Sequence, residues 1–161
     1  MKTVILDLDN CIADDAWRIP SIDWSQSDMM GRYHDYHSLA AFDKVANTDL
    51  FEELSAENRL IIMTARPVLY RAATEHWLDT NGVGYDILMM RSNADHRASA
   101  ELKESQLHRA ILDFGLITNE VICAYDDRPD VVAMYRRNLV NAEVRAIHSI
   151  CAYTKPSEET V

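Results

Sequence analysis

Two carboxylates near the N-terminus, Asp7 and Asp9, are the residues whose types and spacing point most directly to chemistry. They follow the apolar run Val4-Ile5-Leu6, which predicts a buried strand with both acids at its carboxyl end. Open α/β sheets bind their ligands at that edge. Because two carboxylates this close repel each other, a cation between them makes it easier to ionise both. A hard divalent ion such as Mg²⁺ prefers oxygen ligands, so the pair predicts metal-assisted chemistry at Asp7.

Three further places carry polar side chains that would suit an anion or a metal. Thr64 ends a second apolar run, where it either grips a phosphate oxygen or caps a helix. Lys103 shares the apolar stripe of a predicted helix, so it either meets an anionic partner or extends along the core margin. Asp126 and Asp127 end another strand, where turn formation is the alternative. Together with the first acid pair, these residues form a constellation that is more specific than any of its parts.

Short apolar runs alternate with helical patterns along the chain, which indicates a parallel, doubly wound sheet. The predicted strands are Thr3–Leu8, Leu60–Thr64, Tyr85–Met90, Val121–Tyr125 and Glu143–Ile147. Helical spacing predicts three helices between them. The first carries Leu69, Ala72, Ala73, His76 and Trp77 on one stripe, the second Leu107, Ala110, Ile111 and Phe114, and the third begins at Pro129. The expected fold class is a three-layer, Rossmann-like α/β sandwich around a central parallel five-stranded sheet.

Residues 16–47 interrupt this alternation with aromatic and sulfur-containing side chains among polar ones. They predict a small lid-like insertion after the first strand, with no large cap domain. We expect a single domain over residues 1–154 and a flexible acidic tail over 155–161.

Composition limits the function classes. The chain has 161 residues, 48% hydrophobic and 26% charged, as expected for one globular domain. No apolar run approaches the ~20 residues of a membrane span, and the N-terminus does not resemble a signal peptide. The cysteines, Cys11, Cys123 and Cys151, lack metal-type spacing and favour free thiols in a reducing cytoplasm. A formal net charge of −10 argues against an extended duplex-binding face, but is compatible with a small phosphorylated substrate or a strand end.

The order of the motifs resembles the haloacid dehalogenase superfamily of phosphatases, from Val4 to about Ile147. A closer similarity is to the phosphatase domain of phage-type polynucleotide kinase 3′-phosphatases. The local patterns that carry this similarity are Ala13-Asp14 followed by Arg18, Met90-Arg91 with Asp95-x-Arg97 before Lys103, and Asp126-Asp127-Arg128 running into Val131-Val132-x-Met134-Tyr135-Arg136.

The resemblance implies a covalent mechanism. Asp7 would attack phosphorus and form an aspartyl-phosphate. Asp9 would protonate the leaving oxygen and then deprotonate the hydrolytic water. Thr64 and Lys103 would neutralise the phosphoryl oxygens. The groups that would hold Mg²⁺ are the Asp7 carboxylate, the Asp9 backbone carbonyl, Asp126 and Asp127.

The expected substrate is a phosphomonoester of a nucleotide or of a nucleic-acid 3′ end, with a nucleoside 5′-monophosphate as the alternative. A cationic rim would bind it through Arg18, Arg66, Arg97 and Arg128, together with Arg91. The insertion carries aromatic residues that either stack on a base or pack the insertion onto the sheet, namely Trp17, Trp24, Tyr33 and Tyr36. The chain lacks a Gly-x₄-Gly-Lys-Ser/Thr loop, so no kinase domain is expected in it.

One departure from the family pattern leaves a second class of function open. Asn10-Cys11 stands where the family usually has Gly-Thr, although Asn10 tolerates the backbone of a tight turn. This change favours a binding protein that keeps the fold with little catalysis. The intact Asp7 and Asp9 favour an enzyme.

Two other phosphatase classes fit less well. A cysteine-dependent phosphatase needs Cys-x₅-Arg, and neither Cys11 nor Cys123 has an arginine at that spacing. His34-Asp35 and His37 suggest a metal-dependent HD phosphohydrolase, but no histidine precedes His34.

Overall fold

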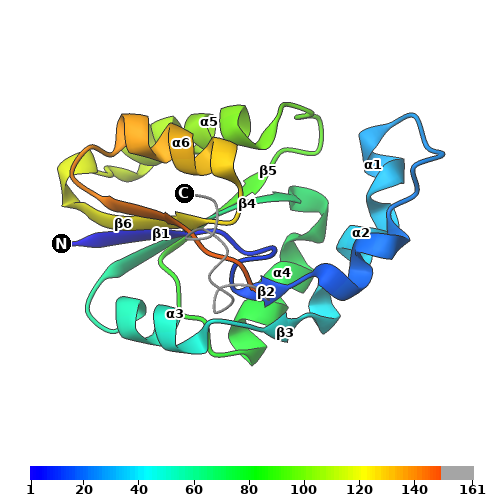
Figure 1. Ribbon diagram of the computed structural model, residues 1–161, viewed down its shortest axis with the longest axis horizontal. Coiled ribbons are helices and arrows are strands. Elements are labelled where there is room, and N and C mark those ends of the chain that lie inside the picture. The colour runs from blue at the N-terminus through cyan, green and yellow to red at the C-terminus, as the bar shows by residue number, and fades with distance from the viewer. Residues whose placement is uncertain (150–161) are drawn as a thin grey trace, which may run out of the picture.

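The computed structural model describes residues 1–149, apart from the side chains of Asp49 and Glu53. Five strands form one sheet in the order β5-β4-β1-β6-β7, with all neighbouring pairs parallel. The strands are β1 (Thr3–Leu6), β4 (Arg59–Pro67), β5 (Ile87–Arg91), β6 (Val121–Asp126) and β7 (Glu143–Ala146). The predicted α/β class and its central parallel sheet are confirmed (Figure 1).

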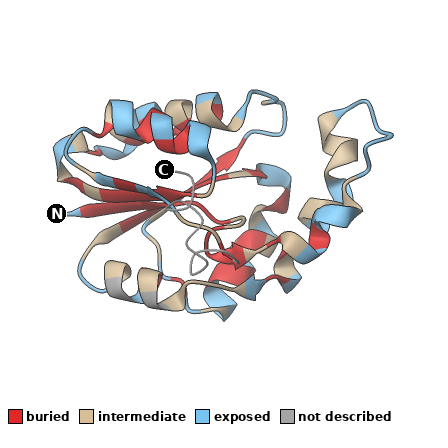
Figure 2. Cartoon of the chain, viewed as in Figure 1, coloured by how far each residue is buried: buried red, intermediate tan, exposed pale blue. Residues whose placement is uncertain are grey.

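β1 is the central strand because its residues are apolar on both faces. Val4, Ile5 and Leu6 are completely buried, and β1 pairs with β4 on one side and β6 on the other. Val4 and Leu6 belong to the core cluster that contains Trp77, whereas Ile5 belongs to the cluster that contains Leu107. Figure 2 shows the buried strands in red between two layers of helices. A strand buried on both faces appears in the sequence as a continuous apolar run.

Helices cover both faces of the sheet and make the outer layers. Their bounds are α3 (Thr48–Ser55), α4 (Arg71–Thr80), α5 (Ser99–Phe114) and α6 (Pro129–Asn138). α3 and α4 cover one face, and α5 and α6 cover the other (Figure 1). The short 3₁₀ turns η3 (Val68–Tyr70) and η4 (Thr118–Glu120) lead into α4 and β6. Pro129 opens α6 as predicted, since its fixed φ suits the first helical position.

The buried face of α4 differs from the predicted stripe. Trp77 faces the core as predicted, but its buried neighbours are Thr74 and Leu78, which the predicted stripe does not contain. The stripe residues found exposed instead are Leu69, Ala72 and His76. Leu69 lies in η3, before the helix begins at Arg71, so a stripe counted from it is out of phase with α4.

The end of α5 also departs from its predicted stripe. Leu107 and Ala110 are buried, whereas Phe114 is 44% exposed. Gly115 ends the helix with a φ of +65°, a left-handed conformation that glycine adopts without strain. The chain then returns to the core at Leu116, which is buried in place of Phe114.

A small helical segment, residues 16–42, lies at the carboxyl edge of the sheet and is called the lid below. It contains η1 (Ala16–Ser21), α1 (Met29–Arg32), α2 (His34–Ser38) and η2 (Leu39–Phe42). An antiparallel ribbon of β2 (Ala13–Asp14) and β3 (Lys44–Val45) joins its two ends. Figure 1 shows α1 and α2 projecting from the sheet. In residues 1–149, this segment is a small insertion rather than a large cap, as the fold prediction required.

Some predictions fall outside the described residues, namely those on Cys151, the domain end at 154 and the tail 155–161. Cys11 and Cys123 are buried free thiols. None of the helices in residues 1–149 combines the length and the apolar composition that a membrane crossing requires.

Candidate active site

The carboxyl edge of the sheet brings three carboxylates together. Asp7 follows β1 directly, and Asp126 ends the neighbouring strand β6, with Asp127 next in the chain. Oxygen atoms of the three side chains lie within 4.8 Å of one another. Asp7 is 6% exposed and Asp126 is fully buried, so water screens their repulsion poorly. The acids of the two predicted strand ends therefore form one cluster.

Lys103 lies between two of these carboxylates. It is in the second turn of α5, which runs along the sheet with this side chain facing inward. Its Nζ atom is 2.6 Å from Asp7 Oδ1 and also donates a hydrogen bond to Asp126. The residue is 1% exposed. It is therefore a lysine with buried anionic partners, and the alternative of a lysine extending along the core margin is excluded.

The charges of this cluster do not balance. Burial raises the pKa of the Asp7 carboxyl well above its usual range, against the ammonium of Lys103, and the Asp126 carboxylate adds to the rise. Burial alone would lower the pKa of Lys103, but Asp126 and Asp7 outweigh it and raise that pKa. With all three acids ionised, one ammonium would face three carboxylates, which would leave an excess of negative charge. Oxygen donors with excess negative charge fit a hard divalent cation.

Asp9 is turned toward two buried arginines. It accepts hydrogen bonds from Arg66 at 2.7 Å and 3.0 Å and also from Arg18. Burial would raise the pKa of Asp9, but the guanidinium groups of Arg66 and Arg18 prevail and lower it far below its ordinary value. Both arginine side chains are completely buried. The predicted cationic rim is therefore wrong for Arg18 and Arg66, because their charges are used to hold Asp9.

A second carboxylate, Asp43, completes this arrangement and was missed in the sequence. Its side chain is fully buried and lies 2.8 Å from Arg18 Nη2 and 3.3 Å from Arg66 Nη2. Trp17 Nε1 also donates to it at 3.0 Å, so this hydrogen bond joins the start of the lid to the residue that follows its end. A lone aspartate in an irregular insertion gives no motif. Asp43 could have been inferred only indirectly, because two arginines with buried side chains need more than one negatively charged partner.

Thr64 is placed differently from the prediction. β4 continues past it to Pro67, with an irregular register after Met63, so the residue lies inside the strand rather than at its end. Its hydroxyl accepts a hydrogen bond from the Arg66 N–H at 3.2 Å. Because α4 begins only at Arg71, Thr64 is no helix cap. The residue is fully buried, and its role in holding a phosphoryl oxygen stays a prediction.

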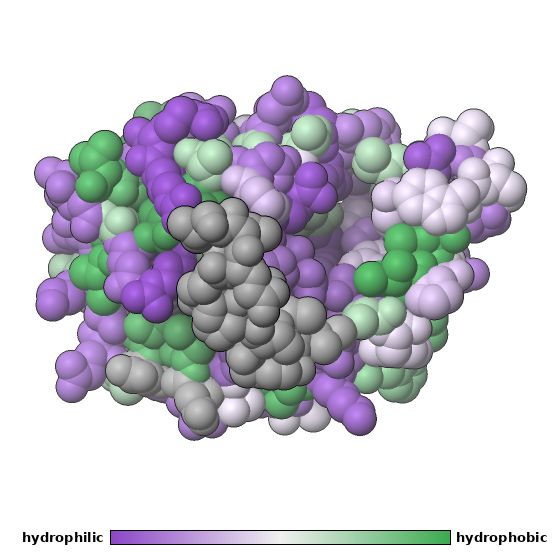
Figure 3. Space-filling model, viewed as in Figure 1, coloured by the Kyte–Doolittle hydropathy of each residue, from purple (hydrophilic) through white to green (hydrophobic). Residues whose placement is uncertain are grey.

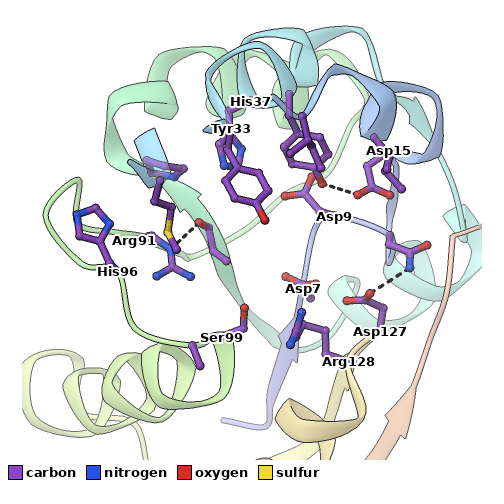
Figure 4. A pocket seen from close by; sticks show the side chains of 18 of the residues that line it. Asp7, Asp9, Asp15, Tyr33, His37, Arg91, His96, Ser99, Asp127 and Arg128 are labelled. Carbon is purple, nitrogen blue, oxygen red and sulfur yellow. Dashed lines mark hydrogen bonds between the residues drawn. The ribbon is translucent and has the colours of Figure 1, made fainter. Parts of the chain in front are cut away.

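A cleft of about 700 Å³ opens above Asp7, between the lid and the loops that follow β5 and β6. Asp7, Asp9 and Lys103 line it, so three of the predicted catalytic residues meet there. Figure 4 shows Asp7 and Asp127 on one side of the cavity, with Tyr33 across from them. In Figure 3 the same region is a hollow between the lid and the rest of the surface.

Two of the predicted substrate-binding arginines do face this cleft. Arg97 and Arg128 line it, and about half of each side chain is exposed. Arg97 forms an ion pair with Asp95 at 2.7 Å, and Arg128 forms one with Asp130 at 3.1 Å. Arg91 also borders the cleft, but it is mostly buried and donates to backbone carbonyls, among them that of Arg97 at 2.8 Å. It thereby shapes the loop that carries Arg97.

Asn10 keeps the tight turn after the first acid pair, as the sequence suggested. Its φ of 54° lies in the left-handed region. Its side-chain Nδ2 donates to Asp127 Oδ2 at 3.0 Å, a contact that the sequence did not indicate. Ser149 Oγ donates to Asn10 Oδ1 at 3.1 Å. The residue in the family's glycine position therefore links the Asp7 loop to Asp127.

A doubly wound sheet with these acids at one edge is the architecture of haloacid dehalogenase hydrolases. A family model, the polynucleotide kinase PNKP phosphatase domain, matches residues 1–145. The chain therefore belongs to this family of phosphatases, and the predicted resemblance is confirmed.

Solved structures agree with this assignment. The chain is 25% identical to a chain of a Pnkp1/Rnl/Hen1 RNA repair complex, with a TM-score of 0.66 over 91% of this chain and 42% of the other. A second structure of the Pnkp1/Rnl/Hen1 complex gives 25% identity and a TM-score of 0.65, over 91% and 45%. A HAD-superfamily hydrolase of subfamily IA from Geobacter sulfurreducens, 14% identical, shares the fold with a TM-score of 0.54 over 88% and 86%. Among curated proteins, none matches the chain significantly. This chain spans less than half of either repair-complex chain.

Proposed function

We propose that the protein is a Mg²⁺-dependent phosphatase that removes the 3′-phosphate from a nucleotide or a polynucleotide end through an aspartyl-phosphate. The observation that carries the proposal is the position of Asp7. It lies at the floor of the cleft, against the ammonium of Lys103 and within reach of two further carboxylates. A buried nucleophile beside a fixed cation suits attack on a phosphoryl group.

The first step forms a bond between an Asp7 carboxylate oxygen and phosphorus, while the bond from phosphorus to the leaving oxygen breaks. Asp9 gives its proton to that oxygen. In the free protein, Arg66 and Arg18 keep Asp9 ionised. Asp9 therefore takes up a proton from solvent as the phosphate binds, because a dianion beside a carboxyl group raises the pKa of that group.

In the second step water attacks phosphorus, the bond to Asp7 breaks and Asp9 accepts the proton of the water. The ionised state of Asp9 in the free protein suits this role as a base. Lys103 stays beside the transferring group throughout and donates hydrogen bonds to its oxygens. Arg97 and Arg128, at the cleft surface, would contact the parts of the substrate beyond the phosphate.

The donor set suits Mg²⁺. Asp7, Asp126 and Asp127 would hold the ion together with the Asp9 backbone carbonyl, to which no donor in residues 1–149 is hydrogen-bonded. When bound, the ion supplies positive charge that neutralises phosphoryl oxygens and the excess charge of the acids. The resemblance to the repair-complex chains supports a polynucleotide end as the substrate.

Phosphate release tests the proposal. The substrates are a nucleoside 3′-monophosphate, the matching 5′-monophosphate and a 3′-phosphorylated oligonucleotide, each with Mg²⁺ and with excess chelator. We expect Mg²⁺-dependent release from the 3′-phosphates and none from Asp7→Asn. A preference for the 5′-monophosphate would contradict the proposed substrate and favour a nucleotidase. Release from none of the three would favour a binding protein.

A further inference from the structure

The wall of the cleft that the lid provides is apolar and aromatic. It consists of Ile19, Ile22, Trp24, Met29, Met30 and Tyr33. Trp24 is 68% exposed and Ile19 is 49% exposed, although both are large apolar side chains. Figure 3 shows apolar residues of the lid beside the hollow. Packing of the core does not explain this wall, since its side chains face the cleft rather than the sheet.

Tyr33 occupies a fixed position in this wall. Its ring packs edge-to-face with Trp24 at 6.2 Å and with Tyr36 at 6.0 Å. Tyr36 is itself held by its hydrogen bond to Asp15 and by the Arg18 guanidinium, 4.0 Å from its ring centre. Tyr33 is only half-buried, and Figure 4 shows its hydroxyl end pointing into the cavity. A held but accessible ring loses little entropy when a planar ligand stacks on it.

The opposite wall is polar and cationic. His96, Arg97 and Arg128 line it; Arg97 is paired with Asp95, which is mostly buried, and Arg128 with the exposed Asp130. The pair of Arg128 with Asp130 is exposed, and exposed ion pairs contribute little free energy, so a phosphate can replace Asp130 at small cost. The cleft therefore has stacking surface on one side and anion-binding groups on the other, with Asp7 at its floor.

A single nucleic-acid strand has the same division, with bases on one side and phosphates on the other. Its bases are unpaired and open to stacking, whereas the formal net charge of −10 disfavours a long duplex. We infer that the lid wall is a subsite for the bases at the 3′ end of a single strand, with Tyr33 stacking on the terminal base. Arg97 and Arg128 face the backbone phosphates that precede it. This inference rests on the proposed function, because the terminal phosphate must lie at Asp7.

Binding to the Asp7→Asn protein tests the subsite without requiring turnover. The probes are two fluorescent 3′-phosphorylated oligonucleotides that differ only in the terminal nucleotide, one with its base and one abasic, made as DNA and as RNA. We expect about tenfold tighter binding when the base is present, as one stacking contact provides. In Asp7→Asn, Tyr33→Leu should remove that difference and leave abasic binding unchanged. Tyr33→Phe should restore it, because the ring is kept.

Phe42→Leu is the matched control, since Phe42 is an exposed aromatic residue of the lid outside this cleft. It should keep the tenfold difference. Equal binding of the two probes, or a difference that survives Tyr33→Leu, would overturn the subsite.

Hydrolysis by the unaltered protein is measured separately. Turnover of both probes with equal binding refutes the subsite alone, whereas a base-dependent affinity without turnover refutes the proposed function alone.

Discussion

The side-chain amide of Asn10 donates a hydrogen bond to Asp127 Oδ2 at 3.0 Å, from a backbone with a φ of 54°. One residue thus performs two separable tasks. Its backbone makes the turn after the first acid pair, and its side chain fixes a carboxylate of the proposed metal site.

Asn10→Gly separates these tasks. Glycine adopts a positive φ freely, so the thermal midpoint should stay close to that of the unaltered protein. The lost hydrogen bond should weaken Mg²⁺ binding by roughly three- to tenfold, as measured by calorimetry. Asn10→Ala should weaken Mg²⁺ binding equally but also lower the midpoint, because alanine is strained at this φ. Unchanged Mg²⁺ affinity in both variants would contradict the role of the Asn10 side chain.

Asp43→Asn tests the buried charges behind Asp9. It leaves Arg18 and Arg66 with one carboxylate instead of two, and unpaired buried charge is costly. We expect the free energy of unfolding to fall by about 3 kcal/mol in denaturant titrations. Asp113→Asn removes an exposed partner of Arg109 and should change it by less than about 0.5 kcal/mol. Similar stability of the two variants would show that the Asp43 pairs contribute nothing.

Lys103→Met tests the cation between the acids. We expect phosphate release to fall about a hundredfold or more, since a fixed donor beside the phosphoryl group is lost. The variant also leaves Asp7 and Asp126 without their ammonium. Added Mg²⁺ should therefore raise its thermal midpoint more than that of the unaltered protein. A variant that retains activity, or that gains no more stability from Mg²⁺, would count against this arrangement.

Asp15→Asn should reveal a pH-dependent stability. Burial raises the pKa of Asp15 to about 6, against its hydrogen bond from Tyr36, whereas the unfolded value is about 4. The folded protein therefore binds this proton more tightly, and its stability falls as the pH rises from about 4 to above 6. The neutral amide avoids that loss. The thermal midpoint of the variant should exceed that of the unaltered protein by roughly 5 °C at pH 8 and by little at pH 4. A constant difference would refute the shift.

The sequence predicted the positions of those site residues that lie in, or directly follow, regular strands and helices. Asp7 and Asp126 stand at the ends of apolar strands, and parallel pairing places such ends together. The helical spacing of the apolar residues around Lys103 correctly predicted that its side chain faces inward. The insertion over residues 16–47 gave no periodic signal, so Asp43 was missed and Arg18 was assigned to the surface. Arg66 was misplaced as well, since its buried partners, Asp9 and Asp43, lie far from it in the chain. The contact of Asn10 with Asp127 joins residues far apart in the chain, and only the folded structure brings them together.

Capture of the covalent intermediate tests the central claim most directly. A 3′-phosphorylated oligonucleotide with a radioactive terminal phosphate is mixed with the protein and Mg²⁺, and the reaction is stopped in acid within one turnover. If Asp7 is the nucleophile, label stays on the protein, is released by hydroxylamine as an acyl phosphate, and is absent from Asp7→Asn. Phosphate release without any labelled protein, or labelling that persists in Asp7→Asn, would contradict the proposed mechanism.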